Sequence, residues 1–333
     1  QKLLIFSNYV DRKLTERLSE LATKISHADC EIIYYESHDE ISTHDIENKV
    51  QENYAFIKLN YFRRFSSSLN FVTEKSHFDL KMKILSKHSQ KGKIQSCSTV
   101  IPSMPWALEI YPNLDQEMAF NRLYKDLIHV AYCDKDDNLS YLKTKLEKLK
   151  LQVDYLNQSK ITSIKFHSSS NDLDLKLNND YVWIGSFQQV NGINYLPNFP
   201  TYEIFTYPLK KNINGTISIT RPFMFNNQFI TNLVITILDG KITTLESNQD
   251  ISEFQSFLYK HESRLYFGEI ALVNKSNPIQ ELDTHFNCII LDENAVCHIA
   301  IGNAYSVTCR NFEENIRNDS MNQSDIHIDL MFG

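Results

Sequence analysis

Residues 233–245 read LVITILDGKITTL, two apolar runs joined by the pair Asp239-Gly240. Asp-Gly supplies the positive φ angles of a type I′ turn, so the stretch predicts a tight β-hairpin. Short alternating stretches also occur at 161–166, 173–177, 181–187 and 216–220. We therefore expect the chain after residue 160 to be rich in short strands.

The residues before 160 alternate between helical and strand patterns instead. Apolar side chains recur every three or four positions in 11–25, which predicts an amphipathic helix, and 30–35 is typical of a buried strand. A strand at 94–101 leads into a loop at 102–107, and helical periodicity returns at 115–132. This alternation predicts an α/β arrangement for the first part of the chain.

A longer helix is predicted between Leu139 and Leu156. Leucine and valine follow a 3,4,3,4,3 spacing there, behind a cap at Asp136 or Asp137. One interpretation is a coiled-coil seam between two copies of the chain. The other is an ordinary helix that packs on its own sheet and closes the first domain, which the shortness of the run, about three heptads, favours.

Length and composition indicate a globular protein with more than one core. Single cores stop growing at roughly 250 to 300 residues, and this chain has 333, of which 42% are hydrophobic and 23% charged. We expect two domains, 1–160 with an α/β fold and 161–333 with a β-rich α+β fold. No Pro/Gly-rich linker separates them, which favours domains that pack together.

Charge and hydropathy disfavour two classes of partner. A net charge of −7 lacks the cationic surface that a nucleic-acid backbone requires. No apolar run reaches the roughly 18 to 20 residues of a membrane span, and the charged start of the chain does not resemble a secretory signal. The six cysteines are scattered without a Cys-x-x-Cys pair, which is typical of reduced thiols. We therefore expect a cytoplasmic protein with no nucleic-acid or membrane partner.

Common catalytic signatures are missing from the sequence. It has no Gly-x-Ser-x-Gly elbow, no phosphate-binding or dinucleotide-binding glycine loop and no His-Glu-x-x-His, which disfavours serine hydrolases, nucleotide enzymes and single-zinc proteases. What remains is a set of carboxylates and histidines in the second half. They lie among apolar or small residues, where a charge is costly unless it has a partner or binds an ion.

Three segments carry these residues. Glu269 opens a hydrophobic strand, and Glu293 and His298 bracket small and apolar residues. His327 and Asp329 are two apart in an alternating pattern, so a strand would point both to one face. Each segment also has a structural interpretation: a solvated strand end, a hydrogen-bonded core histidine and the polar face of an edge strand. The spacing fits a site for one metal ion as well as a site for two.

Four segments share a further pattern: 198–206 (NFPTYEIFT), 268–273 (GEIALV), 292–302 (DENAVCHIAIG) with Tyr305, and 327–333 (HIDLMFG). Together they resemble the M29 metalloaminopeptidases, the group of aminopeptidases T, S and PepS, in residues, order and spacing. The resemblance covers most of 160–333 and is loose before that. It implies that the β-rich C-terminal domain carries a two-metal site facing the first domain.

The resemblance also implies the ions and their ligands. The cofactors would be two divalent metal ions, zinc or cobalt foremost and manganese or magnesium otherwise, that share a bridging carboxylate and a water. The corresponding positions are Glu203 as a ligand of the first metal, Glu269 as the bridge, Glu293 and His298 as ligands of the second metal, and His327 and Asp329 as the remaining ligands.

The implied activity is removal of single residues from short peptides with a free amino end. Two such ions lower the pKa of a bridging water and polarise the scissile carbonyl. Tyr305 corresponds to a tyrosine close to the metals that would stabilise the developing oxyanion, and Glu269 and Glu203 are the candidates for the carboxylate that shuttles the proton. The resemblance further implies a homodimer. Tyr202 departs from the family, which often has a second Glu there.

Two other functions stay open. One is a mononuclear iron dioxygenase of the same fold, and the other is an inactive homologue that acts as a binding protein. Retention of Glu203, Glu269 and Glu293 favours the peptidase, because iron dioxygenases use a sparse set of two His and one carboxylate. None of the six ligands is lost, which disfavours the inactive homologue.

Overall fold

The computed structural model describes residues 2–7, 12–34, 42–61, 82, 84–89, 91–226 and 228–333. The chain forms two compact units, one of 1–131 with 187–200 and one of 132–186 with 201–333. Asp11 of the expected first helix and Tyr35 of the strand after it lie outside the described residues. Among the described helices, none is long and apolar enough to cross a membrane.

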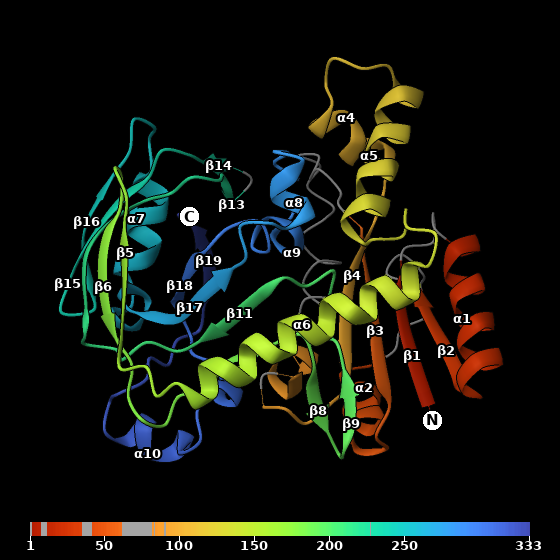
Figure 1. Cartoon of the computed structure of the whole chain (residues 1–333), viewed down its shortest axis with the longest axis horizontal. Helices are drawn as coiled ribbons and strands as arrows, with labels where there is room; N and C mark the ends of the chain where they lie inside the picture. The colour runs from red at the N-terminus through yellow and green to blue at the C-terminus, as the bar shows by residue number, and fades with distance from the viewer. Residues whose placement is uncertain are drawn as a thin grey trace. The chain divides into compact units, whose positions relative to one another are not determined.

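The first unit contains a five-stranded parallel sheet in the order β10-β4-β3-β1-β2 (Figure 1). Side chains alternate across β1, so Leu3 and Ile5 pack on one face with α1, and Leu4 and Phe6 pack on the other with α2. The helices are α1 (Arg12–Ser26) and α2 (Thr43–Gln51), and the strands are β1 (Lys2–Ser7), β2 (Asp29–Tyr34), β3 (Ala55–Tyr61), β4 (Ser96–Ile101) and β10 (Asn198–Phe199). The α/β arrangement expected for the first part of the chain is confirmed.

Two details of the first unit differ from expectation. β2 is half-buried, not buried, because among the described strands it lies at the edge of the sheet and pairs only with β1. The expected loop at 102–107 is largely helix α4 (Met104–Ile110). Its N-cap Ser103 accepts the backbone N–H of Trp106, and a proline is tolerated in a first turn. The helix expected at 115–132 is α5 (Gln116–Val130), capped by Asp115.

The second unit is built on two five-stranded antiparallel sheets that share one apolar core. The first sheet runs β19-β18-β17-β11-β7 and the second β16-β15-β12-β6-β5 (Figure 1). The strands of the first sheet are β7 (Ile184–Gly185), β11 (Glu203–Thr206), β17 (Phe267–Val273), β18 (His298–Gly302) and β19 (His327–Met331). Those of the second are β5 (Ser163–His167), β6 (Asp172–Lys176), β12 (Ile213–Ser218), β15 (Val234–Leu238) and β16 (Lys241–Glu246). The expectation of a β-rich second part is confirmed, although only two residues of 181–187, those of β7, form a strand.

Short elements complete both units. The second unit contains the β-ribbon of β13 (Phe223–Phe225) and β14 (Gln228–Ile230) and the helices α7 (Ser252–Tyr259), α8 (Pro278–Glu281), α9 (Ile289–Asp292) and α10 (Phe312–Arg317). The first unit contains the hairpin of β8 (Gln188–Val190) and β9 (Ile193–Tyr195).

The long helix is α6 (Asn138–Gln158), which begins at the N-cap Asp137. Leu146 and Leu149 are buried, and Val153 and Leu156 pack against the core of the second unit. Leu149, Val153 and Leu156 therefore serve the core of their own unit, as in the ordinary-helix interpretation. Contacts place α6 in the second unit and not at the end of the first. The domain boundary near 160 stays a prediction, since compactness is not a test of independent folding.

The hairpin of β15 and β16 confirms the prediction made from its Asp-Gly turn. Asp239 has a φ of 48° and Gly240 a φ of 78°, as a type I′ turn requires. The β8–β9 hairpin uses the same device, with Asn191 at 52° and Gly192 at 77°. The two glycines differ in their surroundings: a Cβ on Gly240 would lie 1.6 Å from the carbonyl oxygen of Lys210, whereas a Cβ on Gly192 would meet nothing within 4 Å.

This pair separates backbone strain from close packing. Gly192→Ala adds only the positive-φ penalty, about 1 kcal/mol. Gly240→Ala adds the same penalty and an overlap with the main chain at Lys210, so we expect a loss of roughly 3 kcal/mol. Urea denaturation of both variants measures the difference. Equal losses would show that the contact with Lys210 does not restrain the turn.

Candidate metal centre

The first sheet of the second unit has an apolar face and an ionisable face. Four strands give residues to the apolar core, among them Ile204, Ile270, Ile299 and Leu330. The residues next to them point to the opposite face, because side chains alternate along a strand. That face carries Glu203 on β11, Glu269 on β17, His298 on β18, and His327 and Asp329 on β19.

Small residues leave room among these side chains. Ala271 lies opposite His298, Ala300 lies opposite both Glu269 and Asp329, and Gly302 lies opposite His327. Ala271 and Ala300 are fully buried. The register therefore surrounds a small space with carboxylates and imidazoles rather than filling it with apolar side chains.

The ionisable side chains form two groups of three that share Glu269. In the first group, His298 Nε2 lies 3.2 Å from Glu203 Oε2 and 3.4 Å from Glu269 Oε1. In the second, His327 Nε2 lies 3.7 Å from Glu269 Oε2 and 3.2 Å from Asp329 Oδ1. Each oxygen of the Glu269 carboxylate thus faces a different imidazole, and the prediction that His327 and Asp329 share a face is confirmed.

Main-chain carbonyls orient both imidazoles. His327 Nδ1 lies 2.8 Å from the oxygen of Asn303, and His298 Nδ1 lies 3.4 Å from that of Val296. A carbonyl accepts only, so in each ring Nδ1 carries the proton that it donates. Nε2 of both rings is thereby directed at the carboxylates, the arrangement that metal-ligating histidines adopt.

Burial and mutual repulsion shift the pKa values of the cluster. Burial, reinforced by Glu269 and Asp329, raises the pKa of Glu203 to about 8. For His298 burial acts in the lowering direction, but Glu269 and Glu203 outweigh it and raise its pKa to about 9. His327 also reaches about 9, where Asp329 outweighs burial. Burial acts to raise the pKa of Asp329, but His327 outweighs burial and holds this pKa below its usual range. The cluster therefore favours positive charge at its centre.

The donor set fits a divalent cation. Within the described residues, Glu203 Oε2 and His298 Nε2 are buried without a hydrogen-bond partner. Such atoms are costly in a protein interior, and both belong to the classes of ligand, carboxylate oxygen and imidazole nitrogen, that zinc and similar ions take.

Glu293 and Tyr305 lie beside the two groups. Glu293 is buried at the C-terminal end of α9, and its pKa is raised by burial and by the charges of Glu203 and Asp329. It is in neither group of three. Tyr305 stacks on His327 with 4.5 Å between ring centres, and burial followed by Glu269 and Asp329 raises its phenol pKa. The phenol is therefore a hydrogen-bond donor at neutral pH.

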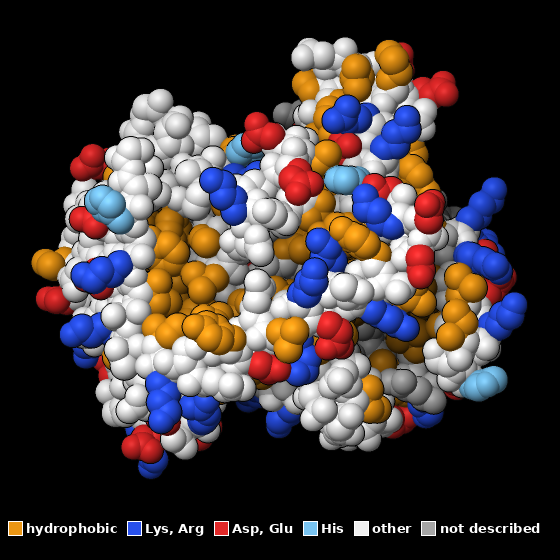
Figure 2. Space-filling view, viewed as in Figure 1, with side chains coloured by type: hydrophobic (Ala, Val, Ile, Leu, Met, Phe, Trp, Pro, Cys, Tyr) orange, Lys and Arg blue, Asp and Glu red, His pale blue; other side chains and the backbone are white. Residues whose placement is uncertain are grey.

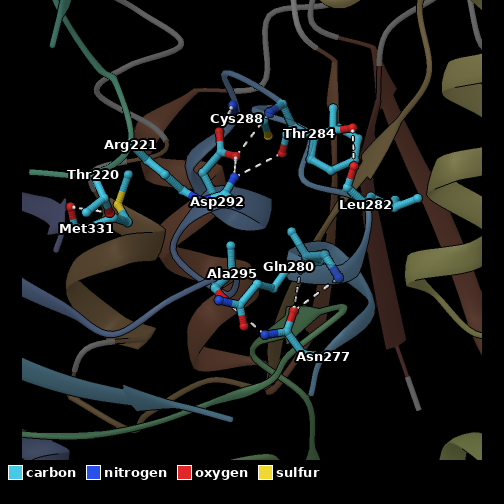
Figure 3. Close-up of polar contacts among 12 residues, drawn as sticks. Thr220, Arg221, Asn277, Gln280, Leu282, Thr284, Cys288, Asp292, Ala295 and Met331 are labelled. Atoms are coloured by element: carbon cyan, nitrogen blue, oxygen red, sulfur yellow. Dashed lines mark hydrogen bonds and ion pairs between the residues drawn. The ribbon is translucent and has the colours of Figure 1, made fainter. Parts of the chain in front are cut away.

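A second polar network, which sequence reasoning did not single out, supports the segment before Glu293 (Figure 3). The Asp292 carboxylate accepts the backbone N–H groups of Phe286, at 3.0 Å, and Cys288, at 2.9 Å. Arg221 Nη1 donates to Asp292 Oδ1 at 3.3 Å and to the carbonyl of Thr284 at 2.9 Å. Burial still raises the pKa of Asp292 to about 6. The sequence carries no signal for this network, because Arg221 and Asp292 are 71 residues apart.

Comparisons with known proteins agree with this description. The chain is 28% identical over 238 residues to aminopeptidase 2 of Geobacillus stearothermophilus, with 70% of the chain and 58% of that protein covered. It is 27% identical over 252 residues to aminopeptidase AmpS of Bacillus subtilis, with 74% and 62% covered. Aminopeptidase T of Thermus aquaticus is 28% identical over 231 residues, with 68% and 57% covered. The chain thus spans about three fifths of the length of these relatives.

The solved structure of wild-type AmpT from Thermus thermophilus has the same fold. It superposes with a TM-score of 0.88 at 21% identity and covers 100% of this chain and 88% of that one. The family model of the thermophilic metalloproteases, M29, matches residues 67–333. This match includes both groups of carboxylates and histidines, and the chain belongs to the M29 family of metalloproteases.

Proposed function

We propose that the protein is a metal-dependent aminopeptidase that removes the N-terminal residue of short peptides at a dinuclear site. The observation that supports this most is the position of Glu269, whose two oxygens face two different imidazoles. A carboxylate shared by two sets of ligands is what a pair of neighbouring cations requires. Zinc or cobalt suits the mixed oxygen and nitrogen donors best, with manganese or magnesium as alternatives.

The ligands divide around Glu269. Glu203 and His298 would hold one ion, and His327 and Asp329 the other, with Glu269 common to both. This grouping keeps Glu203 and His298 together, whereas the resemblance assigns them to different metals. Glu293 lies close enough for its charge to interact with those of the other carboxylates. It would be a further ligand of the ion that Glu203 holds.

The chemistry follows from the side chains around the cations. When bound, two divalent ions supply a water of low pKa and polarise the scissile carbonyl. Tyr305 remains protonated and would donate a hydrogen bond to the oxyanion as it develops. Glu269 and Glu203 would be the candidates for moving a proton from the water to the leaving amine, with Glu203 ahead of Glu269, whose two oxygens would both be committed to cations. One of the two cations would also hold the free α-amino group through its nitrogen lone pair, which would favour substrates with an unblocked end.

The alternatives are less well supported. A mononuclear iron dioxygenase uses two His and one carboxylate with open positions, whereas four carboxylates gather here. An inactive binding protein has no need of buried, like-charged residues in contact. The cytoplasmic location and the homodimer inferred from the resemblance are also proposals.

Tyr202 bears on substrate preference. Its ring packs edge-on against Tyr132, with 5.8 Å between ring centres. Together with Ile204 and Leu149 it lines a mainly apolar groove of about 420 Å³, on the side of β11 opposite to Glu203. Apolar side chains gather over the region of β11 and β17 in Figure 2. Where the family often has a second Glu, the ring of Tyr202 thus makes a contact outside the metal cluster. We therefore expect that Tyr202→Glu would not add a metal ligand.

Metal analysis tests the dinuclear site. Protein purified without chelator should hold two equivalents of divalent metal and lose peptide hydrolysis after dialysis against a chelator. Glu269→Gln should lower the occupancy of both sites, because both share this carboxylate, whereas Asp329→Asn should lower that of one. Glu262→Gln, an exposed carboxylate paired with Lys241, is the matched control and should retain both. A single equivalent in the unaltered protein would contradict a dinuclear centre.

Substrate analogues test the requirement for a free amine. A leucine anilide should be hydrolysed, and the same anilide with an acetylated amine should be inert, because acetylation turns the amine into an amide, whose nitrogen is a poor metal ligand. Release of the chromophore is measured for both, and an arginine anilide compares side-chain preference. Hydrolysis of the acetylated compound at a similar rate would show that the protein is not an aminopeptidase.

Tyr305→Phe tests the oxyanion donor. Loss of one such donor typically lowers kcat by about 10²- to 10³-fold, and we expect KM to change little because the phenyl ring still stacks on His327. Steady-state kinetics and metal content are measured together. An unchanged kcat with full metal content would remove Tyr305 from the mechanism.

A further inference from the structure

Asn294 is fully buried between two elements that carry candidate metal ligands. Its Oδ1 accepts the backbone N–H of Tyr202 at 2.6 Å, and its Nδ2 donates to the carbonyl of Ile290 at 3.0 Å. Nδ2 also lies 3.5 Å from Glu293 Oε1. Because one partner is a backbone donor and the other a backbone acceptor, only this orientation of the amide satisfies both.

These contacts fix the position of the main chain next to two carboxylate side chains. Tyr202 immediately precedes Glu203, the first residue of β11. Ile290 lies in α9, which ends at the C-cap Glu293. One buried amide therefore joins the main chain at Tyr202, next to Glu203, to Asn294, next to Glu293, across 92 residues of sequence.

A restraint of this kind matters because the two carboxylates repel each other. Both are buried, and Glu203 is the charge that acts most strongly on Glu293. Like charges in a medium of low dielectric move apart, or take up protons, unless a cation or a fixed main chain holds them. Ligands of a metal ion must be in place before the ion arrives if binding is to be tight.

We propose that Asn294 is a positioning residue of the metal centre, which holds the main chains of Glu203 and Glu293 at the separation that a cation needs. The inference rests on the proposed function, since it requires the cluster to bind metal. Asn294 acts through its neighbours and contacts no reacting atom.

The structure separates this role from the folding of α9. Arg221 and Asp292 hold the segment before α9 through main-chain contacts at Thr284, Phe286 and Cys288 (Figure 3). α9 therefore has an anchor that does not involve Asn294. Removal of the amide should release the link to Tyr202 and leave the helix in place.

Asn294→Ala is the test, and Asn171→Ala is its matched control. Asn171 is also a buried asparagine that joins distant segments: its Oδ1 accepts the backbone N–H of Ser218 and its Nδ2 donates to the carbonyl of Phe332, each at 2.7 Å. Neither partner adjoins a candidate ligand. Asn294→Ser, which leaves a smaller cavity, is a second variant. Zn²⁺ affinity is measured by competition with a chromophoric chelator, coordination by the absorption spectrum of the Co²⁺ form, and stability by Tm of the metal-free protein.

The two asparagines should differ in metal binding and not in stability. We expect a similar loss of Tm for Asn294→Ala and Asn171→Ala. Affinity for Zn²⁺ should fall about 10- to 100-fold in both Asn294 variants, with an altered Co²⁺ spectrum and a lower kcat at similar KM, and should be unchanged in Asn171→Ala.

Three results would overturn the inference. The first is Zn²⁺ affinity and a Co²⁺ spectrum unchanged in the Asn294 variants, and the second is an equal loss of affinity in Asn171→Ala. The third is failure of both Asn294 variants to fold where Asn171→Ala folds, which would make Asn294 a residue of the fold. If the unaltered protein binds no Zn²⁺ at all, it is the proposed function that fails.

Discussion

Repulsion between buried carboxylates is the constraint on which the second unit is built. Glu203, Glu269, Glu293 and Asp329 are directed at one another in an interior where isolated charges are unstable. In the described part of the chain, the ion-pair partners of Glu203, Glu269 and Asp329 are His298 and His327. Two imidazoles cannot neutralise four carboxylates. The other carboxylates must then take up protons, as the raised pKa values of Glu203 and Glu293 indicate, or bind cations, and this choice is the physical reason for expecting cations there.

The sheet that carries these ionisable side chains also gives them a stable framework. Alternation along β11, β17, β18 and β19 gives one face to the apolar core and the other to the ligands, so the same strands that stabilise the unit also hold the site. Ala271, Ala300 and Gly302 keep that second face from filling. One face of the sheet thus contributes to the stability of the unit, and the opposite face carries the candidate metal ligands.

The sequence predicted the features that depend on local patterns. The Asp239-Gly240 turn requires positive φ angles that few residue pairs adopt, and His327 and Asp329 follow the period of a strand. Helix α4 was missed because its signal is weak: a seven-residue helix has little periodicity, and its proline is read as a break although it lies in the first turn. The spacing of residues fits a site for one ion as well as a site for two, since the difference depends on how far apart strands place their side chains.

The supporting residues could not be predicted for a different reason. Asn294 stands within the segment that resembles the family, yet its role depends on Tyr202, which is 92 positions away. Arg221 and Asp292 are likewise distant in sequence. Their partners are largely backbone groups, and these do not vary with residue type. A contact with a distant backbone group leaves no periodic pattern in the sequence, so it can be recognised only in the structure.

The edge position of β19 has a consequence for synthesis. Among the described strands, β19 pairs only with β18, and its His327 and Asp329 follow the other candidate ligands in the sequence. Since chains emerge from the ribosome with the N-terminal end first, Glu203, Glu269 and His298 are exposed to the cell's pool of ions before the second histidine exists. A nascent chain would therefore hold only part of the proposed centre until β19 pairs with β18.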